Sequence, residues 1–112
     1  MDQQKKKAMV SAWKERHPEM GVMALRCRAT GDTFLTAARD TRVGLNRHTF
    51  QLSAGMHPNG ALQALWKQYG QEGFDRSVVQ VLDYEDPAED HLEELADLLE
   101  LCLLENPDAK KL

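Results

Sequence analysis

A β-hairpin near the start of the chain is the feature that most restricts how it can fold. Residues 22–27 alternate between two faces as a half-buried strand does. Thr30, Gly31 and Asp32 then form a tight turn, and residues 33–36 return as the second strand. The sequence therefore predicts a small sheet that begins with this hairpin.

One helix is predicted before the hairpin and one after it. Residues 3–16 contain good helix formers with apolar side chains at helical spacing, and Pro18 stops them. After the hairpin, Asp40 or Thr41 can cap a second helix, which ends at Gly55. Its apolar residues are expected to mark its buried side; they are Val43, Leu45, Phe50 and Leu52.

Three more elements complete the predicted order. A further helix opens at residues 58–59 and stops at Gly70, and residues 74–82 indicate a third strand because they are rich in valine. Asp86 followed by Pro87 starts the last helix, whose leucine stripe is wider than one core face needs. The order helix, strand, strand, helix, helix, strand, helix predicts an α+β fold with a three-stranded sheet.

Size and composition predict one cytoplasmic domain. The 112 residues suffice for one core, and we divide them into an N-terminal helix (1–18), a main domain (19–107) and a C-terminal tail (108–112). No apolar run approaches the roughly 20 residues of a membrane helix, and no signal-peptide core is present. Cys27 and Cys102 lack the spacing of a metal site or a disulfide framework, so we expect them to be reduced and buried.

The net charge of −4 hides a division along the chain. Residues 1–70 hold eleven Lys/Arg against five Asp/Glu, whereas residues 71–112 hold three against thirteen. An acidic second half is typical of a solvated helix. A basic first half is where a polyanion would dock, because contacts to phosphate supply most of the non-specific affinity for nucleic acid.

Several short motifs follow one another between residues 21 and 74, and the intervals between them form one combined pattern. Gly21-Val22-Met23 is followed, after ten residues, by Phe34-Leu35-Thr36. The chain then continues without a gap through Asn46-Arg47-His48, Gly55, His57, Leu62-Gln63, Gly70 and Phe74. This spacing resembles the GIY-YIG nuclease domain, and in particular small stand-alone bacterial proteins that share NRHxFQL, GxHPN and LQ. The resemblance implies a three-stranded antiparallel sheet flanked by helices.

Most catalytic positions of that family are replaced here. In the family, a tyrosine hydroxyl helps to activate water, an arginine stabilises charge on the phosphate, and a glutamate on the last helix holds a divalent metal. The corresponding positions are occupied by Met23, Phe34, Gly44 and Ala96, and neither Met nor Phe has a hydroxyl group. Asp97 is a weak candidate metal ligand, so Mg²⁺ is expected only if cleavage is retained.

Arg47 and His48 are the functional residues that remain on the helix after the hairpin. Arg47 lies three residues beyond Gly44, so its guanidinium could contact a phosphate from the same helix face. Alternatively, Arg47 is a solvated surface residue and His48 packs structurally beside His57. The candidates for nucleic-acid binding are Arg42, Asn46, Arg47, His48, His57 and Lys67.

Three functions remain open from the sequence. The first is a nuclease-like protein without canonical cleavage that still binds nucleic acid (DNA), with Trp66 and Tyr69 either stacking on bases or packing in the core. The second is a protein-interaction or homodimerisation module built on the leucine-rich last helix. The third is an active metal-dependent endonuclease whose rearranged site uses Arg47, His48 and an acidic residue of the last helix.

Overall fold

The computed structural model describes residues 18–86 and 88–112, so the predicted N-terminal helix lies outside the described residues. No helix in this part of the chain is long and apolar enough to span a membrane. The elements are β1 (Met20–Cys27), β2 (Thr33–Ala38), α2 (Thr41–Ser53), α3 (Gly60–Tyr69), the 3₁₀ turn η1 (Gln71–Gly73), β3 (Phe74–Leu82), α4 (Leu92–Glu105) and β4 (Lys110–Lys111).

The sheet has the strand order β3-β1-β2-β4, with β1 antiparallel to both of its neighbours. The predicted α+β fold with an antiparallel sheet is thus confirmed. The two-residue β4 adds a short fourth strand parallel to β2, within the segment 108–112 that we expected to be a tail. In the β1–β2 register Met23 pairs with Thr36 and Leu25 with Phe34, so these four side chains share one face of the sheet.

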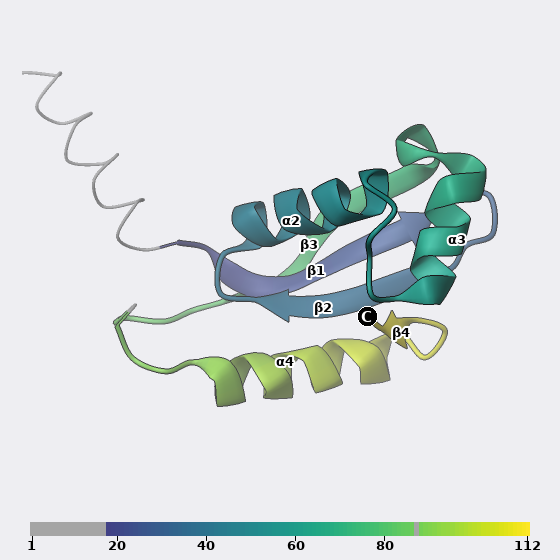
Figure 1. Cartoon of the computed structure of the whole chain (residues 1–112). Helices are drawn as coiled ribbons and strands as arrows, with labels where there is room; N and C mark the ends of the chain where they lie inside the picture. The colour runs from purple at the N-terminus through teal and green to yellow at the C-terminus, as the bar shows by residue number, and fades with distance from the viewer. Residues whose placement is uncertain (1–17, 87) are drawn as a thin grey trace, which may run out of the picture.

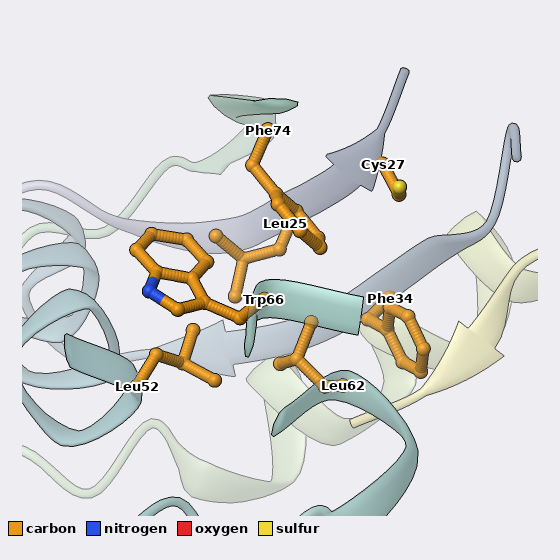
Figure 2. Close-up of a cluster of buried hydrophobic side chains, with 7 residues drawn as sticks. All are labelled: Leu25, Cys27, Phe34, Leu52, Leu62, Trp66 and Phe74. Carbon is orange, nitrogen blue, oxygen red and sulfur yellow. The ribbon is translucent and has the colours of Figure 1, made fainter. Parts of the chain in front are cut away.

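Helices cover both faces of the sheet, as Figure 1 shows for α2 and α4. One core cluster joins the sheet to α2 and α3; it consists of Leu25, Cys27, Phe34, Leu52, Leu62, Trp66 and Phe74 (Figure 2). The other joins the opposite face to α4; it consists of Val22, Ala24, Leu35, Leu99 and Cys102. Both cysteines are free and buried, one in each cluster. The expectation that β1 is half-buried is therefore wrong, because every β1 residue except Arg26 is buried.

Side-chain caps set the helix starts that the sequence predicted. The Asp40 carboxylate accepts a hydrogen bond from the backbone N–H of Val43 at 3.1 Å and begins α2. The Asn59 side chain accepts from the backbone N–H of Leu62 at 3.1 Å and begins α3. Gly70 ends α3 with φ of 72°, a conformation that glycine adopts without steric cost.

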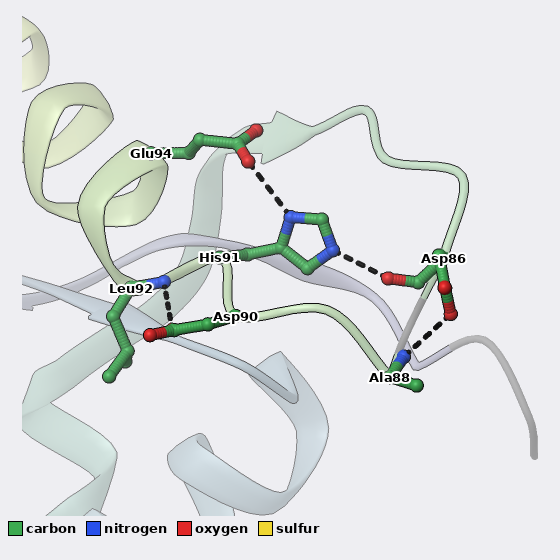
Figure 3. Close-up of polar contacts among 6 residues, drawn as sticks. All are labelled: Asp86, Ala88, Asp90, His91, Leu92 and Glu94. Carbon is green, nitrogen blue, oxygen red and sulfur yellow. Dashed lines mark hydrogen bonds and ion pairs between the residues drawn. The ribbon is translucent and has the colours of Figure 1, made fainter.

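The last helix begins at Leu92, so the prediction that it starts at Asp86 is wrong. The His91 ring lies between two acceptors (Figure 3): its Nδ1 is 3.0 Å from the Glu94 carboxylate and its Nε2 is 2.6 Å from the Asp86 carbonyl. The Asp86 carboxylate accepts from the backbone N–H of Ala88, which closes a local turn. These contacts hold the preceding segment outside the helix.

Two phenylalanines provide a matched test of the core. Phe34 is 2% exposed and Phe50 is 71% exposed. We expect Phe34→Ala to lower the free energy of unfolding by about 3–5 kcal/mol, since it leaves a cavity in the core. Phe50→Ala should change it by no more than about 0.5 kcal/mol. Urea denaturation measures both, and equal destabilisation of the two variants would contradict this assignment of the core.

Candidate nucleic-acid interface

The positions aligned with the family's tyrosines and arginine belong to the packed interior. Met23 is 1% exposed and Phe34 is 2% exposed. A Cβ atom added to Gly44 would lie 2.9 Å from Cε of Met23 and 3.1 Å from Cβ of Ala38. The Met23 thioether thus occupies the space in which a side chain at position 44 would begin. Methyl and thioether groups here supply neither a proton acceptor of useful strength nor a cation.

Ala96 and Asp97 lie apart from this packed surface. Both are exposed on α4, which packs through Leu95, Leu99 and Cys102 on the sheet face opposite to α2. Alanine offers no metal ligand, and residues 18–86 and 88–112 contain no group of three His, Cys, Asp or Glu side chains that could hold a metal ion. The side chains present thus do not fit the family's divalent metal site, and Asp97 as a ligand stays a prediction.

His48 and His57 form a directed hydrogen-bond chain, with 2.9 Å between Nδ1 of His48 and Nε2 of His57. Nδ1 of His57 accepts a hydrogen bond from the backbone N–H of Asn59 at 3.0 Å. This acceptor role places the proton of a neutral His57 on Nε2, which then donates to Nδ1 of His48. The proton of His48 is left on Nε2, which has no partner among the described residues.

The environment favours the neutral form of both rings. Burial lowers the pKa of His57. Burial also lowers the pKa of His48, and the nearby positive charges of His57 and Arg47 lower it further. A second proton on His48 would face the N–H group of His57 and break the chain between them. Geometry and charge therefore agree that the pair is neutral near pH 7.

Gln63 connects this pair to the ends of two helices. Its side-chain oxygen accepts from the backbone N–H of His57 at 3.0 Å, and its amide nitrogen donates to the Leu52 carbonyl at 3.0 Å. With the Asn59 cap, these bonds close the loop between α2 and α3. The NRH, HPN and LQ motifs thus have a shared structural role. The alternative in which His48 packs beside His57 agrees with the observed contact between the two rings.

The predicted cationic and amide side chains are exposed on the α2–α3 layer, with Arg42, Asn46 and Arg47 on α2 and Lys67 on α3. Neither the two arginines nor the lysine forms a salt bridge with any described residue. The structure adds Arg76, which sequence reasoning missed; its guanidinium donates to the Thr49 hydroxyl of α2 at 2.9 Å. Its position opposite Leu25 in the β1–β3 register, which the sequence did not reveal, places it on this face.

Charge is divided between the two sides of the sheet. Residues 41–69, which include α2 and α3, contain three Lys/Arg and no Asp/Glu. Residues 83–108, which include α4, contain eleven Asp/Glu and no Lys/Arg. Since α2 and α4 cover opposite faces (Figure 1), the charge asymmetry along the sequence becomes an asymmetry across the molecule.

The two aromatic residues considered for base stacking have different environments. Trp66 is 5% exposed and packs against Phe74 with ring centroids 5.1 Å apart, which makes it a core residue (Figure 2). Tyr69 is 36% exposed. They do not form a joint platform. The most exposed aromatic ring in the described part of the chain is Phe50. The prediction that Phe50 and Val43 lie on the buried side of α2 is wrong, because the helix packs through Leu45 and Leu52 and these two residues lie on its other side.

This layered sheet, with α2 and α3 on one face and α4 on the other, defines a GIY-YIG-like fold, as the motif spacing predicted. The catalytic domain of homing endonuclease I-TevI matches it with a TM-score of 0.67 at 17% identity, over 83% of this chain and 97% of that chain. A mutant of the catalytic domain of intron endonuclease I-TevI matches with a TM-score of 0.65 at 18% identity, over 78% and 82%. I-TevI is a GIY-YIG homing endonuclease.

No protein-family model and no curated protein matches the sequence. At this level of identity, the likeness to the two I-TevI structures establishes the fold alone.

The three described histidines should titrate on different sides of the ordinary value of about 6.5. We expect His48 and His57 below it, for the reasons above. The pKa of His91 should lie above it, because the Asp86 carbonyl and then the Glu94 carboxylate accept from the protonated ring. Titration of the imidazole C–H signals by NMR measures all three. His57→Ala should raise the pKa of His48, because it removes the N–H group that donates to Nδ1 of the neutral His48 ring.

These directions have opposite consequences for stability. The folded state disfavours protonated His48 and His57, so their contribution is complete above pH 6.5 and is lost as pH falls below it. The His91 contribution is complete below pH 6.5 and is lost as pH rises through its folded pKa. A pKa of His48 above that of His91 would contradict the hydrogen-bond chain.

Proposed function

We propose that this protein binds nucleic acid, most simply DNA, through its α2–α3 layer and lacks the canonical GIY-YIG cleavage reaction. The observation that carries the proposal is the combination of two features on one layer. The Met23 side chain fills the space beside Gly44, while Arg42 and Arg47 are exposed on the same helix and form no salt bridge with any described residue. The α2 helix thus carries cations that can bind phosphate, although the aligned catalytic side chains beside it are replaced.

The absence of cleavage follows from the chemistry of the packed residues. Activation of water requires a group that accepts a proton, and charge on the phosphate requires a donor or cation at the reacting centre. Met23, Phe34 and Gly44 provide neither at the aligned positions. Loss of these groups removes transition-state stabilisation, so cleavage by the family's route would be slowed by several orders of magnitude.

Binding is supported by the distribution of charge. Arg42, Arg47 and Lys67 are exposed on a layer whose residues 41–69 contain no carboxylate. A phosphate backbone approaching this layer meets cations, whereas the α4 side would repel it.

We expect Arg42→Ala/Arg47→Ala to weaken DNA binding and to make the dependence of log affinity on log salt shallower by about one unit for each phosphate that the variant no longer binds. Arg26→Ala is the matched control, because Arg26 is an exposed arginine of β1 on the α4 side of the sheet. Fluorescence anisotropy across a salt series measures both. Affinity that is independent of salt, or equal weakening in the two variants, would contradict binding by the α2–α3 layer.

An active endonuclease with a rearranged site is the least favoured alternative. Its arginine and histidine lie on α2, whereas the acidic residues of the last helix lie on α4, across the sheet. Incubation with plasmid, single-stranded DNA and structured RNA in Mg²⁺ and Mn²⁺ tests it. Cutting that disappears in Arg47→Ala would overturn the proposal that cleavage is absent, whereas we expect no cutting in either protein.

A protein-interaction module is the second candidate, and the outer side of α4 favours it. Leu92, Leu101 and Leu104 are 56%, 55% and 77% exposed, so the leucine stripe is wider than its core contact requires. A homodimer built on this helix should become monomeric in Leu101→Ser/Leu104→Ser. Sedimentation of the wild type as a monomer would remove the homodimer version of this candidate.

A further inference from the structure

The outer face of α2 carries an aromatic ring beside a cation. Thr41, Leu45, His48 and Leu52 form the inner face of this helix. Val43, Arg47 and Phe50 recur at i, i+4 and i+7 on the opposite side, so they form one outward stripe. Phe50 is 71% exposed and Val43 is 43% exposed. The stripe therefore presents apolar and cationic groups together to solvent.

A second apolar side chain lies near the same end of α2. The backbone N–H of Met56 donates to the Gln51 carbonyl at 2.9 Å, which keeps the chain close to the helix after Gly55. Met56 is 69% exposed. Met56 thus adds a second exposed apolar side chain near the end of the helix that carries Phe50, and no Asp or Glu occurs among residues 41–69.

We propose that this outer face of α2 is a site for single-stranded nucleic acid, in which an unpaired base stacks on Phe50 and Arg47 binds the adjoining phosphate. The inference rests on the proposed binding function and deepens it by naming the substrate class. A protein partner could also cover an apolar stripe. The acid-free α2–α3 layer and the acidic α4 side favour a polyanion as the occupant.

The choice of a single strand follows from which part of the nucleic acid each side chain can contact. In a duplex the base faces are stacked on one another, so an exposed surface ring finds mainly sugar and phosphate. An unpaired base offers its face to an aromatic side chain, and this contact tolerates any base. Cations alone would suffice for a duplex backbone. The solvent-exposed ring of Phe50 is therefore useful chiefly to a strand with unpaired bases.

The test compares a labelled oligothymidylate with a blunt duplex of equal length, using fluorescence anisotropy with the full chain. Phe50→Ala should weaken single-strand binding by about 5- to 100-fold, the usual effect of removing one stacked base, and leave duplex binding unchanged. Arg47→Ala should weaken both. Phe50→Tyr should restore single-strand binding, whereas Phe50→Leu should not, because leucine has no aromatic face.

Leu104→Ala is the matched control, since Leu104 is 77% exposed on the acidic α4 side and its truncation should change neither affinity. Failure of the wild type to bind either nucleic acid would overturn the proposed function and this inference together. Duplex and single-strand binding that are both unaffected by Phe50→Ala would overturn only the inference. Sedimentation that shows a wild-type dimer and a Phe50→Ala monomer would assign the stripe to contact between copies and also overturn it.

Discussion

The burial of β1 on both faces is the constraint on which the rest of this structure depends. Its side chains alternate between the α2–α3 layer and the α4 layer, and seven of its eight residues are buried. Transfer of this apolar surface from water is the main source of folding free energy available to a chain of this size. Two separate helical layers are the consequence, and they allow one molecule to carry surfaces of different chemistry.

Met23 and Phe34, which the sequence resemblance aligns with the tyrosines of the GIY-YIG family, are packed in the interior of this structure. A Cβ atom at position 44 would lie 2.9 Å from Cε of Met23, so a side chain there would require the end of the Met23 side chain to move. The motifs that remain, around His48, His57 and Gln63, tie the α2–α3 loop together through hydrogen bonds. These motifs therefore stabilise the fold itself.

The surfaces of the two layers suggest different partners. Under the proposed function, the arginines and the exposed aromatic ring of α2 would bind a polyanion with accessible bases, whereas the acidic groups on the α4 side would repel one. Because the two surfaces lie on separate layers, one molecule has room for a polyanion on the α2 side and for a protein partner on the α4 side. The sheet between the layers keeps them apart.

Local signals in the sequence determined the hairpin, the caps at Asp40 and Asn59, the stop at Gly70 and the bounds of β3, because each depends on neighbours in the chain. The joint spacing of the motifs was sufficient for the fold. Only the tertiary structure decided the start of α4, where the His91 ring binds groups on both sides of it, and the addition of β4. It alone showed that Phe50 is exposed, Trp66 is buried and Arg76 reaches α2, because these outcomes depend on which elements pack against each other rather than on residues nearby in the chain.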